Sequence, residues 1–162
     1  MTLEERNIKI DRMRYTKDKA SSMLILLAIV LDALYFVSIY KTDVGSYYYT
    51  WVIGASIVYN LLFMLMAFLA SEGVKNRKTG YTGMLIGLGA MQFVRIFYLP
   101  AKAVAAEVKI QDVSYRVMEQ PQYILVVTLL AVSGVLCIAG AILSYINNKT
   151  LADYNRAMGN KA

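Results

Sequence analysis

The apolar segment 21–40 constrains the fold of this chain more than any other feature of the sequence. Its residues are SSMLILLAIVLDALYFVSIY, with one charged side chain, Asp32, near the middle. A helix rises about 1.5 Å per residue, so a segment of about 20 residues matches the ~30 Å hydrocarbon layer of a bilayer. The segment therefore predicts a transmembrane helix. A carboxylate at that depth costs about 2.5 kcal/mol or more, so Asp32 is expected to have a partner or a function.

Three more apolar blocks follow the first, and together they predict the class of the protein. The chain is 58% hydrophobic and 17% charged, which is too apolar for an ordinary soluble domain. We expect an all-α integral membrane protein, a four-helix bundle of transmembrane helices over 21–40, 47–71, 80–99 and 121–146. The remaining segments are a basic juxtamembrane helix, a short loop, a longer loop and a tail, at 1–19, 72–79, 100–120 and 147–162.

Glycine and proline mark the expected ends of the spans. Gly73 is placed as the C-cap of the second span, Pro100 as the stop of the third and Pro121 at the first position of the fourth. In the long loop, 101–108 is compatible with a short helix, and the imperfect apolar–polar alternation after it indicates a small strand or hairpin. A loop of this length is either a lid or partner-binding element, or an ordered cap without a ligand.

The distribution of lysine and arginine predicts the orientation of the spans. Twelve of these cations lie in the N-terminal arm, the 72–79 loop and the tail, and four lie on the opposite side. Because cytoplasmic loops carry the excess of lysine and arginine, both termini are expected in the cytoplasm. The 100–120 loop is then extracytoplasmic. The expected location is a plasma membrane, of the bacterial inner-membrane type.

The N-terminal arm combines a helix start with a dense group of cations. Thr2 and Glu5 form a capping box. The cations are interpreted either as part of a lipid-sensing or docking helix, or as an ordinary determinant of topology. No nucleic acid is expected as a partner, because the charge lies beside the spans and is not interleaved with exposed aromatic residues. Four cations next to the first span are assigned to anionic lipid headgroups or a partner protein: Arg12, Arg14, Lys17 and Lys19.

Small residues on the third and fourth spans predict close helix packing. Gly83 and Gly87 form a GxxxG pattern, a spacing that allows two helix backbones to approach closely. Packing within the chain is preferred here to dimerisation. On the fourth span, Ser133, Cys137 and Gly140 contribute to a small-residue packing face.

Four polar side chains at membrane depth are expected to meet inside the bundle: Asp32, Asn60, Gln92 and Arg95. The helical rise places Asp32 about 12 Å and Arg95 about 6–7 Å from the outer ends of their helices, and an arginine stem covers the difference. We therefore predict an ion pair between these two residues in the outer half of the bilayer. Gln92 lies one turn before Arg95 and is expected to support the pair. Tyr35, one turn from Asp32, is expected to do the same.

Three interpretations of this pair remain open. In the structural one, the charges compensate each other and fix the register of two helices. In the functional one, Asp32 is a proton or cation site that admits a substrate, since an acid inside the membrane is functional by default. In the third, the charged side chains extend toward the lipid interface. A counter-ion at Arg95 favours the structural interpretation.

The absence of histidine and the presence of one cysteine, Cys137, narrow the chemistry of the chain. Histidine catalysis, histidine metal or haem ligation and a disulfide framework are excluded. No catalytic, cofactor-binding or metal-binding residue is assigned. The expected function is a non-enzymatic accessory or scaffold subunit of a membrane complex, with a membrane protein or a second copy as partner. The alternative is a small oligomeric transporter or channel that uses Asp32, and a membrane enzyme acting on lipids or thiols is least favoured.

Overall fold

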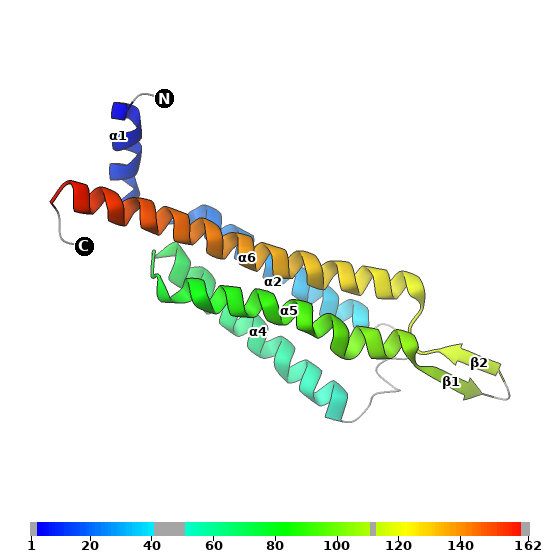
Figure 1. Cartoon of the computed structure of the whole chain (residues 1–162). Helices are drawn as coiled ribbons and strands as arrows, with labels where there is room; N and C mark the ends of the chain where they lie inside the picture. The colour runs from blue at the N-terminus through cyan, green and yellow to red at the C-terminus, as the bar shows by residue number, and fades with distance from the viewer. Residues whose placement is uncertain (1–2, 41–50, 111–112, 160–162) are drawn as a thin grey trace.

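The computed structural model describes residues 3–40, 51–110 and 113–159, most of which are helical (Figure 1). Thr2 of the expected capping box and residues 47–50 of the expected second span lie outside this part of the chain. Among the described residues, four helices are long and apolar enough to cross a membrane, which confirms that prediction. The described elements are α1 (Leu3–Met13), α2 (Lys19–Ile39), α4 (Trp51–Lys75), α5 (Gly80–Ala105), β1 (Glu107–Ile110), β2 (Val113–Arg116) and α6 (Gln120–Ala157).

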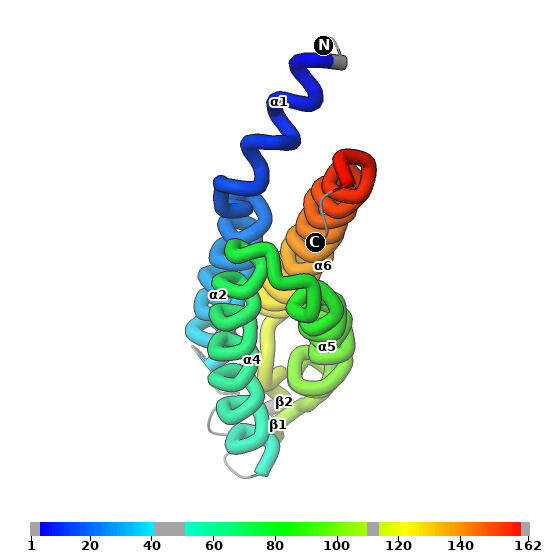
Figure 2. The backbone as a smooth tube through the Cα atoms, turned by 90° about the vertical axis from the view of Figure 1, so that its left-hand side faces the viewer, coloured from blue at the N-terminus to red at the C-terminus, as the bar shows by residue number. Residues whose placement is uncertain are grey.

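The four long helices lie side by side in one bundle, with α1 at one end and the β1–β2 hairpin at the other (Figures 1 and 2). α6 packs against α2 and α5, and α4 packs against the same two helices. α2 and α5 therefore occupy diagonal positions, as do α4 and α6. A side chain that joins α2 to α5 has to do so through the centre of the bundle.

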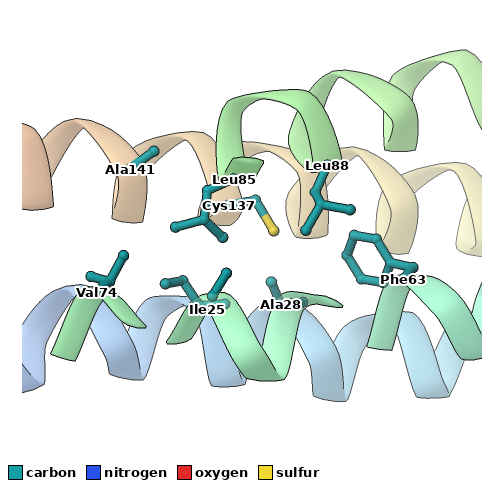
Figure 3. Close-up of a cluster of buried hydrophobic side chains, with 10 residues drawn as sticks. Ile25, Ala28, Phe63, Val74, Leu85, Leu88, Cys137 and Ala141 are labelled. Carbon is teal, nitrogen blue, oxygen red and sulfur yellow. The ribbon is translucent and has the colours of Figure 1, made fainter. Parts of the chain in front are cut away.

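Two apolar clusters fill the interior, one on each side of a central polar layer. In the cluster nearer α1, side chains from all four long helices point toward one another (Figure 3). It contains Ile25, Ala28, Phe63, Ala67, Ala70, Val74, Leu85, Leu88, Cys137 and Ala141. The cluster nearer the hairpin contains Tyr35, Ile39, Leu99, Ala103, Val117, Met118, Val126 and Leu130.

α5 continues through Pro100 to Ala105, so the helix does not stop at the proline as the sequence predicted. Proline removes the hydrogen bond that its N–H would donate to the preceding turn, but membrane helices tolerate it where surrounding protein supports the backbone. Pro100 is buried together with Leu99 and Ala103. This packing keeps the helix continuous.

The turn after α4 is a Schellman motif, and the predicted cap at Gly73 is wrong. Lys78 N donates to Gly73 O (3.0 Å), and Arg77 N donates to Val74 O (2.8 Å). The left-handed residue of the motif is Arg77, with φ +58°. Gly73 is required for a different reason, because a Cβ atom there would lie 2.2 Å from Tyr81 Cδ2.

α6 extends about three turns beyond the expected end of the fourth span at 146, as far as Ala157. Two contacts join this end of the molecule together. Asn147 Nδ2 donates to Asp18 Oδ2 (3.0 Å) at the start of α2. The guanidinium of Arg14 lies over the Tyr154 ring, 5.5 Å from its centroid.

The expected loop contains the hairpin that its alternation indicated. β1 and β2 pair antiparallel, with Val108 opposite Tyr115. Val117 N donates to Ala106 O (3.1 Å), which returns the chain to the end of α5. Val117 and Met118 are buried and cover the end of the second apolar cluster.

Candidate functional site

Asp32 lies in the polar layer between the two apolar clusters, on the buried face of α2. Its Oδ1 atom accepts from Arg95 Nη1 (2.7 Å) and from Gln92 Nε2 (2.9 Å). Both donors belong to α5, which lies diagonally across the bundle. The ion pair expected from the sequence is therefore formed through the centre, and both of its members are buried.

The guanidinium of Arg95 has partners on several sides. Its Nη2 donates to Asn60 Oδ1 on α4, and its Nη1 also approaches Gln92 Oε1 at 3.4 Å. The rings of Tyr35 and Tyr59 have their centroids 4.4 Å and 4.8 Å from its central carbon. Such contacts are attractive because an aromatic face carries negative electrostatic potential, and the attraction increases where water is excluded.

Ser133 extends the network to α6. Gln92 Nε2 lies 3.4 Å from Ser133 Oγ, and Ser133 Oγ donates to the Ala28 carbonyl of α2 (3.0 Å). The sequence placed Ser133 on a packing face, and its hydroxyl proves also to be a polar link. The network joins all four long helices, through Asp32, Asn60, Gln92, Arg95 and Ser133.

Several polar atoms around the pair make no hydrogen bond within the described part of the chain. They are Asp32 Oδ2, Tyr35 OH, Tyr59 OH and Asn60 Nδ2, and all four are inaccessible to solvent. Burying a polar group without a hydrogen bond costs about 1–3 kcal/mol of stability. These four atoms would therefore gain from a further hydrogen-bond partner. The site can therefore hold charge on protein side chains and still accept or donate further hydrogen bonds.

Tyr59 and Ala28 belong to the site but did not emerge from the sequence. Tyr59 directly precedes Asn60. The sequence does not indicate whether the ring of a tyrosine on a membrane helix faces the bundle interior or the lipid. Ala28 contributes only its carbonyl, which no side-chain pattern indicates. The GxxxG pattern of Gly83 and Gly87 gives no information about either residue.

The helix-packing predictions succeed on α6 and fail on α5. Cys137 is buried in the first apolar cluster, and a Cβ atom at Gly140 would lie 3.1 Å from Ile25 Cγ1. Gly83 and Gly87 are exposed and have nothing within 4 Å of an added Cβ atom, so the prediction that they pack within the chain is wrong.

The close approach of α5 to another helix occurs instead at Gly89 and Gly134. A Cβ atom at Gly89 would lie 2.9 Å from the Gly134 carbonyl oxygen of α6, and one at Gly134 would lie 3.0 Å from the Gly89 oxygen. Gly83 and Gly87 lie about 1.7 and 0.6 turns before Gly89, so they occupy another side of the helix. This backbone contact is what brings Gln92 to Ser133.

The cations assigned to lipid or a partner gather at the α1 end of the bundle. Arg12, Lys17 and Lys19 line a cavity of about 690 Å³. Arg14 lines a smaller cavity of about 170 Å³ together with Lys17. In the described residues there is no group of three or more His, Cys, Asp or Glu side chains placed to hold a metal ion.

Comparisons with known proteins do not add a family to these observations. No protein-family model matches the chain, and no curated protein or solved structure matches it. The geometry of the chain itself is therefore the basis for a functional proposal.

Proposed function

We propose that this chain is a non-enzymatic accessory or scaffold subunit of a membrane complex. One observation supports the proposal above the others. The two charges at membrane depth, Asp32 and Arg95, are paired with each other inside a network that joins four helices. A network of this kind fixes the register and rotation of the helices. Moving α2 or α5 would leave a buried charge uncompensated, and moving α4 or α6 would remove a hydrogen-bond partner from a buried polar group.

The outer surface of the bundle suits burial in lipid or against another membrane protein. Large apolar side chains are exposed on the outward faces of the long helices, among them Leu61, Leu65 and Phe68 of α4. α4 begins at Trp51, which is exposed, and tryptophan favours the level of the lipid headgroups. A rigid bundle with such an outer surface is suited to holding a partner helix in place.

In this proposal both termini lie in the cytoplasm and the chain crosses a plasma membrane of the bacterial inner-membrane type. α1, the end of α6 and the turn at 76–79 lie at the same end of the bundle, as this orientation requires (Figure 1). The lysine and arginine excess belongs to that end. The hairpin then lies on the extracytoplasmic side.

Purification of the full chain from native membranes in a mild detergent tests the scaffold role. We expect a second membrane protein to co-purify in a fixed ratio and to remain bound through size-exclusion chromatography. A solitary monomer, or an oligomer of this chain alone, would contradict the proposal. The membranes of cells that lack the chain serve as the control for proteins that bind the resin.

The second candidate function is a small oligomeric transporter or channel that uses Asp32. It is favoured by the polar atoms around the pair that have no partner in the described chain, including Asp32 Oδ2 and Tyr59 OH. Flux into proteoliposomes separates the two functions. Asp32→Asn should abolish pH-dependent flux if Asp32 carries the substrate, whereas Asp18→Asn, at the end of the bundle, should not. Flux unchanged by Asp32→Asn would remove this candidate.

A further inference from the structure

The cavity of about 690 Å³ at the α1 end is lined by a strong excess of positive charge. Three parts of the chain that are distant in sequence form it: the N-terminal arm together with the start of α2, the turn between α4 and α5, and α6. The smaller cavity beside it shares Tyr15, Thr16, Lys17 and Arg77 with it. The cations that line the larger cavity are Lys9, Arg12, Lys17, Lys19 and Arg77.

The one acid that lines the larger cavity, Asp18, is already engaged. Its Oδ1 accepts from Ser21 N (3.2 Å), and its Oδ2 accepts from Ser21 Oγ (2.9 Å) and Asn147 Nδ2 (3.0 Å). The carboxylate therefore caps the N-terminus of α2, whose partial positive charge compensates it. Asp18 is buried, and its single negative charge is outnumbered by the five positive charges that line the cavity.

Arg77 is the residue that identifies the cavity as a binding site. It occupies the left-handed position of the Schellman motif, where glycine is strongly preferred and another residue is strained. Its Nε donates to the Thr16 carbonyl (3.1 Å), which fixes the guanidinium at the wall of both cavities. Its Nη1 is buried and makes no hydrogen bond within the described residues. A strained arginine with a spare buried donor among other cations fits an anion with several acceptor oxygens.

The level of the cavity in the bundle identifies the source of that anion. α2 begins at Lys19, and Asn147 directly follows the apolar part of α6, so the cavity lies where the apolar spans end. Met23, one turn along α2 from Lys19, is 65% exposed and lies within the apolar part of the helix. A molecule with an anionic head and an apolar chain would match both features. Its head would bind in the cationic cavity, and its chain would pack along α2 at Met23.

We propose that this cavity binds the phosphate of an anionic phospholipid headgroup. Arg77 and Arg12 offer the planar donor arrangement that matches phosphate oxygens, and the lysines supply further charge. The site is independent of the scaffold role, because it does not use the central ion pair.

Native mass spectrometry of the full chain in a non-ionic detergent tests the site, with dioleoylphosphatidylglycerol and dioleoylphosphatidylcholine as probes. We expect adducts with the anionic lipid at concentrations where the zwitterionic lipid gives none. Arg77→Gly should weaken the adduct about fivefold, the value of one cation near a membrane surface. Glycine suits the left-handed position, so this variant should fold as well as the parent. Lys78→Ala removes the same charge from a neighbour that lines neither cavity, and should change the affinity much less.

A second pair of variants, on α1, tests the site without altering the turn that contains Arg77. Arg12→Gln alters an exposed residue of α1 that lines the cavity, and Arg6→Gln alters one that does not. The proposal requires the first to weaken the adduct and the second to leave it nearly unchanged. If both variants of a pair lost affinity for the anionic lipid equally, the binding would be a diffuse electrostatic attraction, and the proposed site would be wrong. Equal binding of the two lipids, or displacement of phosphatidylglycerol by an equal concentration of glycerol 3-phosphate, would also overturn it.

Discussion

Two buried carboxylates of this protein, Asp32 and Asp18, are compensated in different ways. Asp18 accepts from the backbone N–H and the hydroxyl of Ser21, three residues further along its own helix, with Asn147 as an additional donor. Asp32 depends on Arg95, which is 63 positions away and on the diagonal helix. The first charge is held chiefly by local structure, and the second only by the assembled bundle.

This difference predicts how each region responds when a partner is removed. A helix N-terminus continues to offer N–H groups after a single substitution nearby, so the region of Asp18 loses one contact at a time. At the centre, removal of one charge leaves the other buried without compensation. The central network should therefore be far more sensitive to single substitutions than the α1 end.

Arg95→Met is expected to have the largest effect, lowering the free energy of unfolding by about 3–5 kcal/mol, because it leaves the Asp32 carboxylate buried without its counter-ion. Reversible denaturant unfolding in detergent micelles measures the change. The double variant Asp32→Leu/Arg95→Met removes both charges and should recover most of the loss. A double variant as unstable as Arg95→Met alone would show that the pair is not the source of the sensitivity.

Gly89→Ala should lower the free energy of unfolding by about 1–3 kcal/mol, since the added methyl group forces α5 away from α6. Its Cβ atom would lie 2.7 Å from Ile138 Cγ1 and 2.9 Å from Gly134 O. Gly87→Ala is the matched control, because it meets nothing within 4 Å. The control should stay within about 1 kcal/mol of the parent in the same unfolding assay. Equal losses would mean that both glycines contribute to the packing of α5.

Asp18→Ala should lower the free energy of unfolding by about 0.5–2 kcal/mol, the usual effect of losing an N-cap. The same assay measures it, and amide hydrogen exchange at the start of α2 reports the location of the change. Asp18→Asn retains an acceptor for Ser21 N and should cost less. A loss as large as that of Arg95→Met would contradict the distinction between the two carboxylates.

The smallest effect is expected at the contact between Ser22 and Ser71, whose hydroxyl oxygens are 2.8 Å apart on α2 and α4. A double-mutant cycle with alanine at both positions should give a coupling of about 0.6 kcal/mol, the average for polar contacts between membrane helices. A coupling above about 2 kcal/mol would exceed the range known for such contacts. It would place part of the bundle's specificity at the α1 end.

Much of the central site was predictable because depth in a membrane helix follows from position in the sequence. Counting residues from the ends of the apolar segments places Asp32 and Arg95 at compatible depths. Because their charges are opposite, they are expected to pair. The same counting does not say which helix face turns inward. Tyr59, next to Asn60, therefore joins the site without any signal in the sequence, and Gly83 and Gly87 turn away from it.

The sequence alone determined the number of long apolar helices and the depth of their polar side chains, since length and polarity are local properties of the chain. The tertiary structure decided the diagonal placement of α2 and α5, the rotation that selects Gly89 over Gly87, and the continuation of α5 through Pro100. Helices that are apolar on every side carry no pattern that distinguishes their faces. Their orientation is therefore set by packing against neighbours, where small residues permit close contact and one buried ion pair fixes the register.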